Sequence, residues 1–152
     1  AVWVDNRNGS YDIYGARVSQ PGIVLDPEGI AISTATGQQL FPSLAYDGTN
    51  YLAVWGDIRS GTSADIYGAR VNQSGTVIDS AGIAICTISG DQRSPCLSYD
   101  GTHYLVVWHD YRSGSLADIY GTRVSQSGTV LDPGGIGIST ATAPSISSYP
   151  CL

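Results

Sequence analysis

The chain has 152 residues, enough for a domain with a sizeable hydrophobic core. Its 19 Gly, its 10 Tyr, the absence of Met and the large excess of Asp over Glu favour turns and strands over helices. A net charge of −6 excludes non-specific nucleic-acid binding, which needs a basic surface, and no apolar run is long enough for a membrane span.

The sequence consists of three copies of one unit, marked by Trp3, Trp55 and Trp108 at spacings of 52 and 53 residues. Each Trp begins the motif Trp-x-Asp-x-Arg, which is followed by Asp-Ile-Tyr-Gly-x-Arg-Val. The recurring charged positions are Asp5, Arg7 and Asp12; Asp57, Arg59 and Asp65; and Asp110, Arg112 and Asp118. We therefore predict a single repeat domain over 1–152, with units of approximately 1–52, 53–105 and 106–152, the last of which is truncated.

The middle unit predicts four strands and no helix. A strand at 42–46 is followed by the turn-forming pair Asp47-Gly48 and by a second strand at 50–57. A third strand is predicted at 65–71, and a fourth at 76–85 that is interrupted near 80–82. The connections have about two to six residues, which is typical of antiparallel strands that neighbour one another in the sheet.

The second strand of the unit is apolar on both faces. Tyr51–Trp55 and Tyr104–Trp108 lack the alternation of apolar and polar residues that a strand covered on one side shows. Both faces are therefore predicted to be buried, as they are when small antiparallel sheets stack face to face around an axis. This favours a β-propeller built from four-stranded blades, with a β-trefoil as the alternative.

Three motifs of the repeat carry a family resemblance: Trp-x-Asp-x-Arg-Ser-Gly, Asp-Ile-Tyr-Gly-x-Arg-Val-x-Gln-Ser-Gly and Asp-x-x-Gly-Ile-x-Ile. They resemble repeats of large secreted or cell-surface bacterial proteins that are taken to form β-propellers. The resemblance extends over essentially the whole chain. It implies a propeller fold and an extracellular or cell-surface location, and it implies no particular activity.

The two ends of the sequence fall at different points of the repeat. Ala1–Trp3 aligns with Ala53–Trp55, and Pro150–Leu152 aligns with Pro95–Leu97, so the chain corresponds to three units less one hairpin. Propellers typically have four to eight blades. We therefore expect either further repeats in a longer chain or self-association through open blade edges, with a homodimer of six blades as the simplest closed ring.

The repeated Asp, Arg and second Asp have two interpretations. In the structural one, Arg59 pairs with a neighbouring Asp and braces the loop, while Asp65 accepts hydrogen bonds from turn amides. In the functional one, the carboxylates bind Ca²⁺ or perform acid–base chemistry. Because active sites are built once whereas structural contacts recur in every unit, the repetition favours loop bracing and predicts no cofactor.

The aromatic residues of the repeat are candidates for ligand binding between blades, where they would stack on sugar rings. They are Trp3, Trp55, Trp108, Tyr14, Tyr67 and Tyr120. The tryptophans lie on the most apolar strand, so the alternative is that they form the core. The tyrosine hydroxyls are better placed to reach a rim.

Cys86 and Cys96 lie ten residues apart and are candidates for a disulfide in an oxidising compartment. The alternative is that they are small buried apolar residues. Cys151 aligns with Cys96 and has no predicted partner. His103 and His109 are expected at the surface, and no cysteine or histidine spacing indicates a metal site.

These features together predict a non-enzymatic binding or structural module of a secreted or surface protein, with a carbohydrate or a protein as ligand. One alternative is a glycoside hydrolase that places carboxylates at the central channel of a propeller. Such an enzyme would need an acid unique to one unit, whereas the Asp positions recur in all three. The other alternative is a structural polymer subunit whose open edges join chain to chain.

Overall fold

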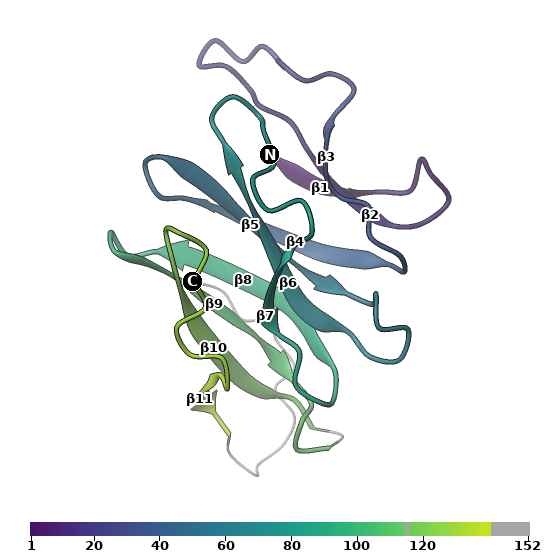
Figure 1. Cartoon of the computed structure of the whole chain (residues 1–152), viewed down its shortest axis with the longest axis vertical. Coiled ribbons are helices and arrows are strands. Elements are labelled where there is room, and N and C mark those ends of the chain that lie inside the picture. The colour runs from purple at the N-terminus through teal and green to yellow at the C-terminus, as the bar shows by residue number, and fades with distance from the viewer. Residues whose placement is uncertain (115, 141–152) are drawn as a thin grey trace.

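The structure, a computed structural model, describes residues 1–114 and 116–140 as an all-β fold of three antiparallel sheets (Figure 1). The first sheet contains β1 (Val2–Asp5), β2 (Asp12–Gly15) and β3 (Ile30–Ser33). The second contains β4 (Gln39–Tyr46), β5 (Asn50–Asp57), β6 (Asp65–Asn72) and β7 (Ile83–Cys86). The third contains β8 (Gln92–Tyr99), β9 (His103–Asp110), β10 (Asp118–Ser125) and β11 (Ile136–Ser139). Within each sheet the strands pair in chain order.

The strands of the second sheet agree with the predicted pattern in its middle and differ at its two edges. β5 coincides with the predicted strand at 50–57, and β6 extends the strand predicted at 65–71 by one residue. The predicted fourth strand is reduced to β7 and a separate bridge between Val71 and Val77. The Asp47-Gly48 turn is confirmed, because the Asp47 carboxylate accepts hydrogen bonds from the backbone amides of Thr49 and Asn50, each at 2.7 Å.

The first strand of each complete sheet contains a bulge that the sequence did not reveal. β4 starts at Gln39, and its pairing with β5 shifts register between Leu40 and Ser43. Phe41 in this bulge has a φ of 55°, and Ser94 at the same position of β8 has a φ of 53°. A proline follows each of these residues, and since proline has no N–H to donate to a ladder, a bulge is where a strand tolerates it.

The second sheet is buried on both faces, as the uninterrupted apolar run of β5 predicts. Because side chains alternate along a strand, Ala53 and Trp55 pack against the first sheet, whereas Leu52 and Val54 pack against the third. All four side chains are fully buried. Figure 1 shows the same order, with the sheets following one another from the purple first sheet to the green third sheet.

A turn of each later repeat also touches the sheet before it. The turn at Gly75 follows β6, and a Cβ placed on Gly75 would lie 2.9 Å from Ile30 Cδ1 and 3.1 Å from Arg17 Nε of the first sheet. Arg17 in turn donates a hydrogen bond to the Gln73 carbonyl at 3.4 Å. The glycine of the Gln-Ser-Gly motif therefore allows close approach between successive sheets.

We expect Gly75→Ala to destabilise the protein more than Gly22→Ala. Both glycines have a φ near 90°, so both substitutions cost about 1 kcal/mol of backbone strain. Only Gly75 has neighbours within 4 Å, so its substitution adds an overpacking cost of about 1 to 3 kcal/mol. Urea unfolding of the two variants measures the difference, and equal losses would contradict a close contact between the sheets at Gly75.

Candidate functional site

The Trp-x-Asp-x-Arg motif folds into one connected group of side chains. Trp55 and Asp57 lie two residues apart on β5 and so point to the same face, where Trp55 Nε1 donates to Asp57 Oδ2 at 2.8 Å. Arg59 follows the strand and binds both carboxylate oxygens, at 2.9 Å through Nε and 2.7 Å through Nη2. Its guanidinium lies 3.8 Å from the ring centroid of Tyr67. Arg59 also donates to the Ala81 carbonyl, so the group ties β5 to β6 and to the loop before β7.

The same group recurs in the other two repeats. In the third, Trp108 donates to Asp110 at 2.9 Å, and Arg112 lies 3.8 Å from the Tyr120 ring and donates to the Gly134 carbonyl. The first repeat has the equivalent contacts in a more open form. There the Trp3–Asp5 hydrogen bond is 3.1 Å, and Arg7 lies 4.4 Å from the Tyr14 ring. These contacts make the motif a brace for the loops at the ends of the strands.

In the first and third repeats the brace lowers the pKa of its aspartate. Hydrogen bonds from Arg7 hold the pKa of Asp5 far below its usual range. Burial by itself would raise the pKa of Asp110, but hydrogen bonds from Arg112 and Trp108 outweigh that effect and lower it. A carboxylate held ionised in this way is a poor general acid.

The second aspartate of the motif faces the first across the strand pair. Asp12, Asp65 and Asp118 lie directly opposite Asp5, Asp57 and Asp110 in the ladders. Asp12 accepts hydrogen bonds from Ser10 Oγ at 3.0 Å and from Asn8 Nδ2 at 3.5 Å, and Asp118 accepts one from Ser113 Oγ at 2.7 Å. Burial, and next the neighbouring Asp57, raise the pKa of Asp65.

The structure contains a second brace that sequence reasoning missed. Arg70 binds the carboxylate of Asp79 through Nε and Nη2, and its backbone N–H donates to the same group. The equivalent pairs are Arg17–Asp26 and Arg123–Asp132. The constant separation of nine residues between Arg and Asp in all three repeats is the pattern that would have revealed them. The two braces account for six of the seven arginines of the chain, and the seventh, Arg93, binds Asp91.

The braces predict that the protein loses stability in acid. Hydrogen bonds from Arg17 and Arg123 lower the pKa values of Asp26 and Asp132 to about 2, against 3.8 in an unfolded chain. Carboxyl groups with a lowered folded-state pKa stabilise the fold above pH 3.8, and this contribution is lost as the pH falls from 3.8 towards 2. Asp65 has a raised pKa and acts in the opposite direction. Thermal melts at pH 6, 4, 3 and 2 measure the effect, and Asp132→Asn should flatten the profile below pH 4. An unchanged melting temperature from pH 4 to 2 would contradict the prediction.

The aromatic candidates lie mainly in the core. Trp55 and Trp108 are fully buried and offer no exposed ring face to a ligand. Trp3 is half-buried because it lies on the outer face of the first sheet. Tyr67 and Tyr120 are half-buried and Tyr14 is buried, and each of the three rings is covered by the arginine of its brace.

The candidate disulfide between Cys86 and Cys96 is not formed, and both are free thiols. Cys86 is on β7, at one edge of the second sheet. Cys96 is on β8, at the opposite edge of the third sheet, so the two thiols lie apart although only ten residues separate them in sequence. Cys86 packs in the core between the second and third sheets. Cys151 lies outside the described residues. His109, expected at the surface, is buried on β9.

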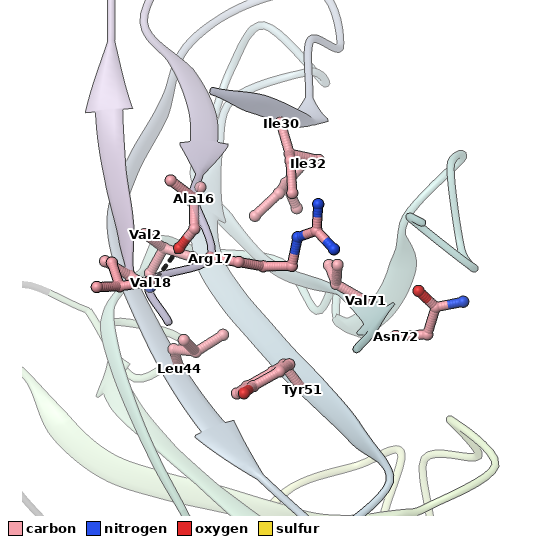
Figure 2. A pocket seen from close by; sticks show the side chains of 12 residues that line it. Val2, Ala16, Arg17, Val18, Ile30, Ile32, Leu44, Tyr51, Val71 and Asn72 are labelled. Carbon is pink, nitrogen blue, oxygen red and sulfur yellow. Dashed lines mark hydrogen bonds between the residues drawn. The ribbon is translucent and has the colours of Figure 1, made fainter. Parts of the chain in front are cut away.

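A pocket of about 180 Å³ lies between the first and second sheets, where Ala1, Gly15 and Arg17 form part of its wall. Figure 2 shows Ile30 and Ile32 of the first sheet on one side of it, and Leu44 and Tyr51 of the second sheet on the other. Its lining is mostly aliphatic, so it suits an apolar side chain better than a polar ligand.

No protein-family model matches the chain, and a search of curated proteins finds no significant match. Within 1–114 and 116–140 no helix has the length and apolar character needed to cross a membrane. In the same part of the chain, no three His, Cys, Asp or Glu side chains form a group able to hold a metal ion.

Proposed function

We propose that the chain is a non-enzymatic structural and binding module of the β-propeller type, in which each sheet is a blade and the ligand is a further blade. Three features support this proposal. The strands of each sheet pair in chain order, the sheets pack face to face, and the first strands of the two complete sheets, β4 and β8, lie against each other as neighbouring inner strands of a propeller do.

The pairing pattern favours a propeller over the alternative β-trefoil. A trefoil closes its barrel by pairing strands from different repeats. In the described residues every ladder between strands stays within one of the three sheets. Successive sheets instead meet mainly through side chains, as stacked blades do, with a single backbone hydrogen bond from Gln39 to Tyr11 and one from Gln92 to Ala64.

One isoleucine of the repeat differs in solvent exposure between the three sheets, and this difference is the observation that supports a role in assembly. Ile32 on β3 and Ile85 on β7 are 5% and 2% exposed, because each is covered by the sheet that follows. Ile138, the same position on β11, is 53% exposed. The far face of the third sheet thus presents an apolar position that the other two sheets use for contact with a next blade.

The chemistry of the repeated acids also supports a structural role. In every copy the first aspartate of the motif is bound by its own arginine, as a loop brace requires. The buried tryptophans favour a protein surface over a sugar as the ligand, because Trp55 and Trp108 have no free ring face. The extracellular setting follows from the resemblance of the repeats and is part of the proposal.

The test is the native mass of the purified chain, measured by light scattering over a range of concentrations. We expect an assembly of two or more chains that Ile138→Asp disrupts, because the substitution places a charge on the contact face. Ile78→Asp is the matched control, since Ile78 is also exposed, at 42%, and belongs to neither of the two core clusters between the sheets. A monomer at all concentrations would contradict assembly, and a mass that rises without limit would identify the structural polymer instead.

A further inference from the structure

We propose that a pocket between the second and third sheets binds an aromatic ring of the size of a phenyl group, carried by an external ligand. The site goes beyond the proposed blade contact, since it takes a much smaller group and shares no residue with the face at Ile138. The pocket has a volume of about 130 Å³, and both sheets that enclose it have four strands. Its lining comes from β4, from β5 and the loop that follows it, and from β8: Leu40, Phe41, Gly56, Ile58, Ala64 and Arg93.

The pocket lies at a repeat position where the second unit has no side chain. Gly56 stands between the Trp and Asp of the motif, and its counterparts are Val4 in the first repeat and His109 in the third. Since side chains alternate along β5, Gly56 is on the face that turns towards the third sheet, the same face as Val54. His109 is only 8% exposed, so the third repeat buries a ring of its own at this position. An aromatic ring from a ligand would occupy the equivalent space in the second repeat.

Nothing in the backbone requires a glycine at position 56. Gly56 does not have a positive φ, unlike most glycines of the chain. A Cβ placed on it would lie 3.6 Å from the Leu40 carbonyl oxygen and 4.0 Å from the Gln92 carbonyl oxygen, which are ordinary van der Waals distances. The glycine is therefore explained by the space that it leaves beside β8, and not by a turn or a close approach of two backbones.

The walls of the pocket are apolar where the third repeat is polar. Leu40 lies opposite Gly56 in the ladder between β4 and β5, whereas its counterpart Arg93 lies opposite the histidine of β9. Ile58 likewise occupies the position that Tyr111 has in the third repeat. An apolar cavity of similar size, about 150 Å³, takes up benzene and excludes water. The second repeat thus combines aliphatic walls with room for a ring, and this combination is not repeated in the third unit.

The bulge of β4 adds an aromatic contact to the pocket. Phe41 is the only phenylalanine of the chain, and its side chain is 51% exposed although it lines the pocket. Ser94 has nearly the same φ at the equivalent position, so the bulge belongs to the repeat and the ring belongs to this site. Aromatic rings favour offset-stacked or edge-to-face contacts with one another. Phe41 therefore favours an aromatic ligand over an aliphatic one.

The test is a titration of the full ¹⁵N-labelled chain, followed by the amide signals of Gly56, Ile58 and Ala64 in NMR spectra. The probes are benzyl alcohol and N-acetylphenylalanine amide, and the control compound is N-acetylalanine amide, which has no ring. We expect saturable shifts of these signals with both probes, at a Kd of about 1 mM, and none with the control. Tighter binding of the phenylalanine compound would identify a peptide side chain as the source of the ring, and equal binding a free aromatic molecule.

Two substitutions locate the probe in the pocket. Gly56→Val introduces the residue of the first repeat and should weaken binding at least tenfold, because the new side chain occupies the space of the ring. Gly134→Val is the matched control: Gly134 does not have a positive φ, no described atom lies within 4 Å of its Cβ position, and it is outside the pocket. We expect this variant to bind as the parent chain does. The melting temperature of each variant shows that it is folded.

Phe41→Ser keeps the test decisive if Gly56→Val does not fold, since serine occupies the same bulge position in the third repeat. We expect it to weaken binding severalfold. The proposal is overturned if neither probe shifts the three signals at about 10 mM, if the alanine compound shifts them equally, or if folded Gly56→Val or Phe41→Ser binds as tightly as Gly134→Val. A chain that self-associates in light scattering and ignores the probes would retain the proposed function and lose only this site.

Discussion

Replacing Trp55 with alanine is expected to lower the free energy of unfolding by about 3 to 5 kcal/mol, the range for removing a fully buried aromatic side chain. Trp55 is fully buried and packs between the first and second sheets with Ile13 and Val71. Its loss leaves a cavity at the centre of that contact and also removes the donor that binds Asp57. Urea unfolding, followed by the fluorescence of the remaining tryptophans, measures the change.

Trp3→Ala is the matched control for this prediction. Trp3 occupies the same motif position and makes the same hydrogen bond, to Asp5, but it is half-buried on the outer face of the first sheet. We expect a clearly smaller loss of stability than for Trp55→Ala. Equal losses from the two substitutions would show that the motif matters through its hydrogen bond, and that packing between the sheets contributes little.

Asp57→Ala is expected to destabilise the protein by about 3 kcal/mol. The Asp57 side chain is fully buried and accepts hydrogen bonds from both Trp55 and Arg59. Its removal leaves the buried indole N–H without a partner and the Arg59 guanidinium without its counter-charge, and both changes carry a desolvation cost. Thermal and urea unfolding give the size of the effect.

The control for this substitution is Asp5→Ala in the first repeat. There the same pair is more open, with the Arg7 side chain 41% exposed against 22% for Arg59. Water can replace the lost contacts of Arg7, so we expect a much smaller effect. A loss as large as that of Asp57→Ala would contradict the view that burial gives the brace its strength.

The parts of the fold that follow from local patterns were predictable. The three repeats, the Asp47-Gly48 turn and β5 depend on residues close together in the sequence, and the structure confirms the turn and the strand. The unit boundaries did not follow in the same way, although the strand predicted at 42–46 lies within β4. The predicted units begin at 53 and 106, whereas the sheets begin at Gln39 and Gln92, because a repeat gives its period and leaves the starting point open.

The features that depend on packing between distant segments were harder to predict. The candidate Cys86–Cys96 disulfide is absent from the structure. The short separation of the two cysteines in sequence gave no information on which edges of their sheets β7 and β8 occupy. The pairing of Arg70 with Asp79 was visible only as a constant spacing, and its role became clear once both ends of the loop were placed. The pocket between the first and second sheets could not be inferred at all, since it depends on how two sheets fit together.

One type of hydrogen bond between successive repeats, from an arginine to a glutamine carbonyl, runs in the same direction each time. Arg17 of the first repeat donates to the Gln73 carbonyl after β6, and Arg70 of the second donates to the Gln126 carbonyl after β10, so in both of these arginine contacts the donor belongs to the earlier repeat. An array with such contacts has two unlike ends and can grow only head to tail. Duplication or deletion of one whole repeat therefore leaves every remaining contact intact, whereas a change of any other length breaks one. We therefore expect a change in the number of repeats to preserve these contacts only when it adds or removes a full unit of 52 or 53 residues.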